Sequence, residues 1–333
     1  MQVKKIGING FGRIGRLAMR VALENPELEV VAVNDLMDVE QLAYLLKYDS
    51  VHGTLNKEVH VDGDILVVDG KNIRVTAIKE AEKLDWGSVE VELVLDCTGI
   101  YKELDSASKH LEAGAKKVLI SAPSKTAPMY VMGVNHEQMT AEENIISNAS
   151  CTTNCLAPMA KIINDNFGMV EGLMTTIHAA TASQSVIDQG NNKNYRLGRS
   201  ALDNIIPTST GAAVAVTKVI PELKGKLTGM AFRVPVANVS VVDLTFKTEK
   251  ATSIHAINKV FEQAAQNEYL GLVAYVKEQL VSQDFISNTF ICNYDAGASM
   301  ELNPNFFKIV GWYDNEYAYA AKMVDLAMHS LNL

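Results

Sequence analysis

The feature that most constrains this chain is a glycine motif close to its N-terminus, Gly10-Phe11-Gly12-Arg13-Ile14-Gly15. It follows a short apolar segment at residues 3–9 and precedes a segment of helical character at residues 16–23. Glycines at these positions allow a tight turn and a close approach of backbone amides to a pyrophosphate, and the helix N-terminus adds a favourable dipole. A strand, this turn and a helix in succession predict a dinucleotide-binding βαβ unit.

A second apolar segment, residues 30–34, ends at Asp35, which lies twenty-five positions after Gly10. An acidic side chain there can accept hydrogen bonds from both ribose hydroxyls and would repel a 2′-phosphate, so it favours NAD over NADP. In the alternative interpretation this is an ordinary parallel βαβ unit, and Asp35 only caps the following helix. Because the strand, the spacing and the acid occur together, we predict that NAD is the cofactor.

Apolar strands and helical segments alternate as far as about residue 150, a pattern typical of an α/β domain with a parallel sheet. Ligands of such sheets lie beyond the carboxyl ends of the strands, so Thr98, Gly99 and Ser121 are expected on the nicotinamide side of the site. For Thr98, ordinary turn chemistry explains the residue equally well. The pattern predicts helices over residues 41–48 and 105–113, a hairpin over 64–68 and 73–78, and strands over 93–97 and 117–121.

Longer β-rich runs follow after residue 151, together with an irregular segment over residues 181–199. Runs of strands favour an antiparallel or mixed sheet. We therefore predict an α/β protein with a dinucleotide-binding domain at residues 1–150, an α+β catalytic domain at 151–314, and an amphipathic C-terminal helix at 315–333 that completes the first domain. The expected strands of the second domain are residues 172–179, 231–236, 239–248 and 308–313.

The composition argues against several classes of function. The 333 residues carry 30 Lys and Arg against 39 Asp and Glu, and this net charge of −9 argues against nucleic acid or an anionic membrane as the main partner. No apolar run approaches the roughly 18 residues of a membrane-spanning helix, and the N-terminus enters the glycine motif without a signal-peptide core. Four cysteines in so long a chain do not form a disulfide framework. We expect a cytoplasmic protein.

The stretch from Ala149 to Pro158 surrounds Cys151 with small polar residues, and apolar residues spaced as on one helix face follow. This pattern places Cys151 in the first helical turn with Ser150 as a good N-cap, where the helix dipole favours a thiolate with a pKa below the free value of about 8.5. An ordinary buried cysteine explains this stretch alone equally well. Cys155 lies one turn later, and we interpret it as core packing. We predict no metal site, because no second ligand pair stands at zinc-finger spacing.

Two further groups can serve a reactive cysteine. His178 ends the apolar strand that begins at residue 172, and an imidazole with an ordinary pKa of about 6.5 can pair with a thiolate and accept a hydroxyl proton. A hydrogen-bonded structural histidine is the alternative. Residues 206–211 and Arg233 offer hydroxyls, amides and a guanidinium suited to phosphate oxygens. In the alternative interpretation, residues 206–211 are an ordinary loop and Arg233 is only a charge at the edge of a strand.

In their order along the chain, these segments resemble the motifs of the glyceraldehyde-3-phosphate dehydrogenase family over the whole length of the sequence. Five separated motifs in the right order make a chance match implausible. The resemblance implies that Cys151 is the nucleophile and His178 is its base. The matching segments are Asn9–Arg16 (N-G-F-G-R-I-G-R), Ser150–Pro158 (S-C-T-T-N-C-L-A-P), Asn204–Gly211, Met230–Pro235 (M-A-F-R-V-P) and Trp312–Glu316 (W-Y-D-N-E).

The resemblance also implies a Rossmann domain and NAD-dependent oxidative phosphorylation of D-glyceraldehyde 3-phosphate to 1,3-bisphosphoglycerate in glycolysis, through a thiohemiacetal and a thioester on Cys151. It implies a homotetramer in which residues 181–199, the S-loop of the family, line the cofactor site of a neighbouring subunit. Erythrose-4-phosphate dehydrogenase, which shares the cysteine and histidine pair, is the nearest alternative. A non-catalytic surface or binding role is the alternative from another class.

Residue roles carry over from the matching positions. Thr181 and Arg233 are implied to hold the substrate phosphate, whereas Ser150, Thr152, Thr210 and Gly211 surround the attacking inorganic phosphate. The sequence departs from the family in a less charged S-loop, in Val214 and in Tyr317-Ala318. Asp35 favours NAD over NADP, and the S-loop changes weaken this preference. The implied cofactor contacts are Gly10, Gly12, Arg13, Ile14, Gly15, Asp35, Lys79 (where arginine is usual), Ser121 and Asn315.

Overall fold

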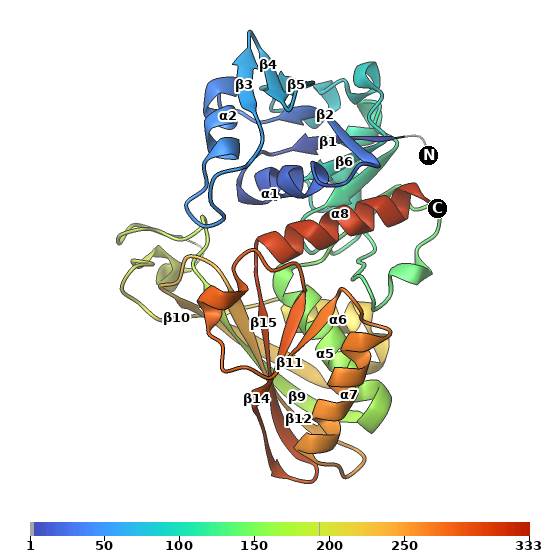
Figure 1. The fold of residues 1–333 in the computed structure, drawn as a ribbon, viewed down its shortest axis with the longest axis vertical. Helices are drawn as coiled ribbons and strands as arrows, with labels where there is room; N and C mark the ends of the chain where they lie inside the picture. The colour runs from blue at the N-terminus through green and yellow to red at the C-terminus, as the bar shows by residue number, and fades with distance from the viewer. Residues whose placement is uncertain (1–2, 193) are drawn as a thin grey trace. The chain divides into compact units, whose positions relative to one another are not determined.

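The computed structural model describes residues 3–192 and 194–333, and they form two compact units, each with its own sheet (Figure 1). The first unit contains the described residues up to Tyr130 together with Gln138–Ala149 and Ala320–Leu333. The second unit contains Val131–Glu137 and Ser150–Tyr319. The last helix of the chain therefore contributes most of its length to the first unit.

The first unit is built on an eight-stranded sheet with the order β3-β4-β5-β2-β1-β6-β7-β8. Strands β5, β2, β1, β6, β7 and β8 run parallel, and β3 and β4 extend the sheet in antiparallel fashion. Because β1 has β2 on one side and β6 on the other, the strand order reverses there, which is where doubly wound sheets bind dinucleotides. The strands are β1 Lys4–Asn9, β2 Leu28–Asn34, β3 Val59–Asp62, β4 Ile65–Val68, β5 Lys71–Thr76, β6 Leu93–Asp96, β7 Lys117–Ile120 and β8 Ile145–Ser147.

The helices of the first unit follow the predicted alternation with one correction. The helix expected over residues 105–113 is wrong, because two short helices occupy this region. The Ser108 hydroxyl donates to the Asp105 carbonyl at 2.8 Å, and Leu111 then bonds to the Ser108 carbonyl in a tighter turn, which interrupts the helical ladder. The helices are α1 Arg13–Ala22, α2 Val39–Lys47, α3 Leu104–Ala107, α4 Lys109–Glu112 and, from Ala320 onward, α8 Tyr317–Leu331.

The second unit contains a seven-stranded mixed sheet with the order β10-β11-β9-β12-β15-β14-β13, as the β-rich runs predicted. Strands β9 and β11 are parallel, as are β13 and β14, and the remaining pairs are antiparallel. Strands β10, β13 and β14 were not among the expected strands. The strands are β9 Met169–Ala179, β10 Ile206–Ser209, β11 Leu227–Val234, β12 Ser240–Thr248, β13 Val273–Val276, β14 Cys292–Asn303 and β15 Phe306–Tyr313.

Three helices, α5 Cys151–Phe167, α6 Ala212–Val219 and α7 Ile254–Gln266, pack on one face of this sheet (Figure 1). The inward side chains of the central strands, such as Met174, Leu244 and Ile309, are fully buried beneath these helices. On the opposite face Leu173 is 64% exposed, and its neighbours Thr245 and Lys308 are also partly open. Among the described residues, α5, α6 and α7 do not cover that face, and the short helix Ser282–Phe285 reaches it where Phe285 stacks on Trp312.

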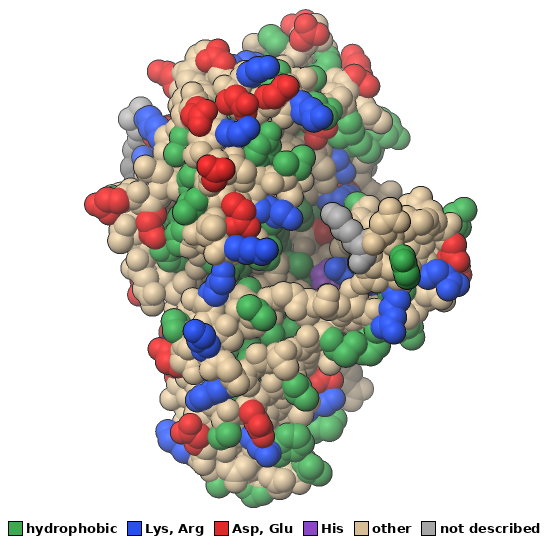
Figure 2. Space-filling view, turned by 180° about the vertical axis from the view of Figure 1, so that it is seen from behind, with side chains coloured by type: hydrophobic (Ala, Val, Ile, Leu, Met, Phe, Trp, Pro, Cys, Tyr) green, Lys and Arg blue, Asp and Glu red, His purple; other side chains and the backbone are tan. Residues whose placement is uncertain are grey.

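The described residues hold no group of His, Cys, Asp and Glu side chains arranged to bind a metal. Within residues 3–192 and 194–333, none of the helices is long and apolar enough to cross a lipid bilayer. The face shown in Figure 2 carries acidic and basic side chains interspersed, without a broad basic patch of the kind that binds nucleic acid.

Candidate active site

Helix α5 begins at the reactive-cysteine stretch. The Ser150 hydroxyl accepts a hydrogen bond from the Thr153 backbone N–H at 3.1 Å, which is the N-cap geometry predicted for this residue. Cys151 is the first residue of the helix. Ala149, immediately before the cap, has φ +53°, a left-handed conformation that is uncommon for a residue with a Cβ. A strained residue next to a capped cysteine is typical of a functional site.

His178 lies next to the end of β9 and faces this cysteine. Its Nε2 is 3.5 Å from Cys151 Sγ, and its Nδ1 is 2.8 Å from the Ala179 carbonyl oxygen. In the tautomer that donates from Nδ1 to this carbonyl, the lone pair of Nε2 faces the sulfur. The structure therefore brings together the side chains of the two predicted catalytic residues.

Arg233 on β11 is directly opposite His178 in the parallel register of β11 and β9. Its Nη1 donates to the Ala179 carbonyl at 3.1 Å and lies against Nδ1 of His178. A fixed positive charge at this position opposes a second proton on the imidazole ring. The charge of Arg233 therefore influences the pKa of both Cys151 and His178.

The electrostatics of the pair correct one prediction. Burial raises the pKa of the Cys151 thiol, and this effect outweighs the opposing effects of Arg233 and of the hydrogen bonds around Thr152. The expectation that the helix N-terminus holds the pKa of Cys151 below its free value is therefore wrong. Burial, and then Arg233, lower the pKa of His178 to about 3. The pair is a neutral thiol beside a neutral imidazole, a general-base arrangement.

Tyr313, the last residue of β15, is buried and contacts both His178 and Thr152, the residue after Cys151. Its hydroxyl lies 2.8 Å from Thr152 Oγ1 and 2.9 Å from Thr176 Oγ1, and its ring meets the edge of His178 with centroids 6.1 Å apart. Thr152, which the resemblance assigned to phosphate, therefore uses its hydroxyl within the protein. Tyr313 was not predicted as a site residue, although its inward position follows from the alternation of β15.

The remaining residues assigned to phosphate lie on loops and at a helix end of the second unit. Thr181 Oγ1 is 3.0 Å from Ser183 Oγ. Thr210 accepts a hydrogen bond from the Ala212 N–H, and Gly211 is the N-cap of α6 without a side-chain cap. First-turn amides without a side-chain cap are able to bind an anion.

The glycine motif of the first unit forms the expected turn. Gly10 has φ +88°, and a Cβ on Gly15 would stand 2.1 Å from the Gly10 carbonyl oxygen, so both positions require glycine. Asp35 braces this turn, because its Oδ2 accepts from Phe11 N at 2.6 Å and its Oδ1 accepts from Met37 N at 3.1 Å. Gly12 begins α1 without a side-chain cap. The arrangement offers amides and a carboxylate at one edge of the sheet.

The other residues assigned to the cofactor are more dispersed. Arg13 pairs with Asp49, the Lys79 side chain is exposed, and Ser121 follows β7, where it is partly buried. Thr98 donates to Asp96 Oδ1 at 2.8 Å and accepts from Ile100 N, so turn chemistry accounts for it. In the second unit, Asn315 Oδ1 accepts a hydrogen bond from Ser240.

Comparison with known proteins identifies the family of the chain. Residues 4–104 match the family description "Glyceraldehyde 3-phosphate dehydrogenase, NAD binding domain", and residues 150–315 match its C-terminal domain. Glyceraldehyde-3-phosphate dehydrogenase 3 of Saccharomyces cerevisiae is 54% identical over 326 residues, covering 98% of this chain and 98% of that protein. Glyceraldehyde-3-phosphate dehydrogenase 1 of Caenorhabditis elegans is 55% identical over 333 residues, with the same coverage of both chains. The chain therefore belongs to the glyceraldehyde-3-phosphate dehydrogenase family.

Proposed function

We propose that this chain catalyses the NAD-dependent oxidative phosphorylation of D-glyceraldehyde 3-phosphate to 1,3-bisphosphoglycerate, a reaction of glycolysis. The observation that carries the proposal is the contact between Cys151 Sγ and His178 Nε2 at the start of α5. A nucleophile within reach of a base, with the base oriented by a third group, is the arrangement that covalent catalysis requires. Membership of the glyceraldehyde-3-phosphate dehydrogenase family supports an NAD-dependent oxidation of an aldehyde as the class of reaction.

In the proposed reaction Cys151 Sγ forms a bond to the aldehyde carbon, and His178 carries the thiol proton to the carbonyl oxygen. The Cys151 amide at the helix start stabilises the charge that develops on this oxygen. His178 then takes the proton of the new hydroxyl as the carbon loses a hydride and becomes a thioester carbonyl. NAD, when bound, supplies the hydride acceptor. An oxygen of inorganic phosphate finally attacks the thioester, the C–S bond breaks, and the departing sulfur regains a proton from His178.

We assign the two phosphates to different groups of residues. Arg233 and Thr181 are proposed to bind the phosphate of the aldehyde, and Ser150, Thr152, Thr210 and Gly211 are proposed to surround inorganic phosphate. The open first turn of α6 and the guanidinium of Arg233 support this assignment, because both suit anions. A phosphate dianion on Arg233 also offsets the positive charge beside His178, so the imidazole accepts the thiol proton more readily once substrate is bound.

The residues of the first unit fit a bound dinucleotide. Each carboxylate oxygen of Asp35 accepts one backbone N–H and keeps further capacity for a ribose hydroxyl. A Cβ at Gly12 would meet nothing within 4 Å, so a pyrophosphate can approach the backbone there. We propose Arg13, Ile14, Lys79, Ser121 and Asn315 as the remaining contacts. We also propose functional domains at residues 1–150 with 315–333, and at 151–314.

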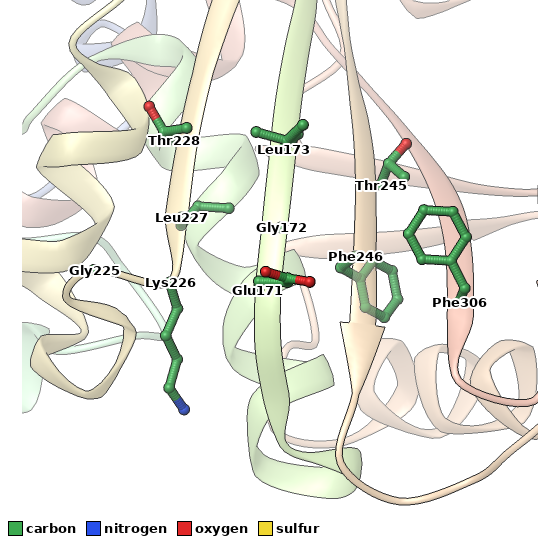
Figure 3. A pocket seen from close by; sticks show the side chains of 10 residues that line it. All are labelled: Glu171, Gly172, Leu173, Gly225, Lys226, Leu227, Thr228, Thr245, Phe246 and Phe306. Carbon is green, nitrogen blue, oxygen red and sulfur yellow. The ribbon is translucent and has the colours of Figure 1, made fainter.

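We further propose a cytoplasmic homotetramer. The uncovered face of the second sheet supports the association, because Leu173 stands exposed there beside an open depression of about 560 Å³ between strands β9, β11, β12 and β15 (Figure 3). Val186 and Ile187 of the S-loop segment are also mostly exposed, as is typical of a surface that another subunit covers. All four cysteines are free, which suits a reducing compartment. Light scattering should give about four times the chain mass of 36.3 kDa.

The activity is tested by comparing D-glyceraldehyde 3-phosphate with erythrose 4-phosphate, each with and without inorganic phosphate, while NADH formation is followed at 340 nm. We expect rapid turnover only with the triose phosphate and phosphate together. Faster turnover of the erythrose compound, or oxidation to a free acid without phosphate, would overturn the proposed reaction.

A further inference from the structure

A fully buried histidine contacts the end of β6, outside the groups of residues described above. His110 lies on α4, and both nitrogens of its ring have polar partners. The Trp86 indole Nε1 donates a hydrogen bond to His110 Nδ1 at 3.1 Å, and His110 Nε2 lies 3.0 Å from Asp96 Oδ2. An indole N–H only donates, so Nδ1 accepts and the imidazole proton is on Nε2. His110 therefore donates a hydrogen bond to Asp96.

Asp96 is the last residue of β6, and both of its carboxylate oxygens accept hydrogen bonds. Oδ2 also accepts from Asn9 Nδ2 at 2.8 Å, and Oδ1 accepts from the hydroxyl and the backbone N–H of Thr98 at 2.8 and 3.2 Å. Asp96 is buried, and a buried carboxylate is stable only where donors surround it. Of these donors, His110 comes from a helix, whereas the others come from the edge of the sheet itself.

Asn9, the last residue of β1, extends the hydrogen bonds to β2. Its Oδ1 accepts from Asn34 Nδ2 at 2.8 Å. The backbone of Ile78 fixes the Asn34 amide, because Oδ1 of Asn34 accepts from the Ile78 N–H and Nδ2 donates to the Ile78 carbonyl, both at 2.9 Å. The direction of every hydrogen bond from Trp86 to Asn34 is therefore set by groups that can only donate or only accept.

This buried chain of hydrogen bonds leads to the two groups that are proposed to hold the dinucleotide. Asn9 directly precedes Gly10, and Asn34 directly precedes Asp35. A Cβ on Gly10 would stand 2.8 Å from the backbone of the turn after β6, so the two turns pack closely together. A group that holds the chain of hydrogen bonds in place therefore also holds the glycine turn and Asp35.

We propose that His110 is a positioning residue, which acts through Asp96 and Asn9 to hold the glycine turn in the geometry that binds the adenosine diphosphate half of NAD. The inference rests on the proposed cofactor contacts. Backbone amides bind the pyrophosphate, and their directions follow the backbone of the turn. A turn that is already held in place loses less conformational entropy when the ligand binds. The contribution of His110 is the Nε2 proton, which fixes Asp96 between the helix and the sheet edge.

The test measures the Kd of NAD and of ADP-ribose by titration calorimetry in two variants of His110. Glutamine places its amide nitrogen near the position of Nε2 and keeps the donor to Asp96, whereas asparagine places its amide near Nδ1 and keeps only the contact with Trp86. We expect His110→Asn to increase both Kd values about five- to tenfold, the effect of one hydrogen bond. His110→Gln should keep both Kd values within about twofold of the wild type.

Urea unfolding separates this role from a general loss of stability. Each His110 variant removes one of the two hydrogen bonds of the buried ring, so both should unfold at lower urea concentrations than the wild type. Tyr130→Phe is the matched control, because the buried Tyr130 hydroxyl donates to Glu143 Oε2 at 2.7 Å in the same unit. Tyr130 lies beside β8, which is three strands from β1 in the sheet. This variant should also lower the urea midpoint but leave both Kd values unchanged.

Asp96→Asn supplies an independent variant that retains the shape of the side chain. An amide has one oxygen, so it cannot accept from Thr98 on one side and from His110 on the other. Both Kd values should increase at least as much as in His110→Asn. This variant decides the question if His110→Asn does not fold.

Four results would overturn the role of His110. These are unchanged Kd values in His110→Asn or Asp96→Asn, equal losses of affinity in the two His110 variants, weaker binding in Tyr130→Phe, and a loss confined to NAD, since ADP-ribose contains the same adenosine diphosphate half. If the wild-type protein binds neither ligand, the proposed cofactor site fails as well. Wild-type binding therefore tests the cofactor site, and the variants test His110.

Discussion

Replacing His178 with asparagine removes the proposed catalytic base while disturbing little else. The asparagine amide extends about as far as Nδ1 of histidine, so it can still donate to the Ala179 carbonyl, which lies 2.8 Å from Nδ1 in the native protein. It has no atom at the position of Nε2, which lies 3.5 Å from Cys151 Sγ. The substitution therefore isolates the contribution of one nitrogen to the reaction.

We expect kcat of His178→Asn to fall about 10²- to 10⁴-fold at pH 7, which corresponds to about 2.7–5.5 kcal/mol of transition-state stabilisation. Burial raises the pKa of Cys151, so without a base the thiol must ionise into solvent. The rate of the variant should therefore increase about tenfold per pH unit through the neutral range. In the wild type, burial and Arg233 lower the pKa of His178 to about 3, so the imidazole is already a neutral base and the rate should be nearly constant above about pH 5.

The assay follows initial rates of NADH formation at 340 nm between pH 6 and 9 with saturating substrates. His60→Asn, at a half-exposed histidine of the first unit, provides the control and should leave the profile unchanged. A His178→Asn enzyme within tenfold of wild type, or one with the flat wild-type profile, would refute the general-base assignment.

Four other substitutions test separate parts of the structure. Cys151→Ser should abolish NADH formation, because a hydroxyl is a far weaker nucleophile than a thiol near neutral pH, and substantial turnover would exclude Cys151 as the nucleophile. Asp35→Ala should increase kcat/KM for NADP, measured with both cofactors at 340 nm, by removing repulsion of the 2′-phosphate; an unchanged preference would move that role to the S-loop. Tyr313→Phe leaves two buried threonine hydroxyls without their partner, so urea unfolding should show a loss of about 1–3 kcal/mol, whereas Tyr195→Phe, at a residue 84% exposed, should show none. Leu173→Asp places a charge on the uncovered sheet face and should yield smaller species by light scattering, and an intact tetramer would exclude this face as an interface.

The sequence was sufficient to predict most of the first unit, because its signals are local. The turn at Gly10, the apolar strand β1 before it and the helix α1 after it depend on neighbouring residues only. Strand β3 escaped prediction because it is four residues long and alternates between partly buried and exposed positions at the edge of the sheet. Asp35 directly follows β2, as the sequence predicted, but its hydrogen bond to Phe11 N came only from the structure.

Predictions for the second unit depended more on contacts between distant residues. Strand β14 contains Asp295, Gly297 and Ser299, which have little preference for strands, and it forms because β13 and β15 pair with it. At the site, the cap at Ser150 could be predicted from four adjacent residues. The pKa of Cys151 could not, because it depends on burial that the folded second unit provides. His110, in the first unit, was overlooked because its partners at positions 86 and 96 become its neighbours only on folding.

The central claim is that oxidation proceeds through a thioester on Cys151 that inorganic phosphate resolves. The most direct measurement mixes the enzyme with D-glyceraldehyde 3-phosphate and NAD in the absence of phosphate, follows NADH at 340 nm in a stopped-flow instrument, and determines the mass of the intact chain. We expect a burst of about one NADH per active chain, an acyl adduct that is absent from Cys151→Ser, and release of the adduct when phosphate is added. Steady NADH formation without phosphate, or a burst that leaves no adduct on Cys151, would contradict the claim.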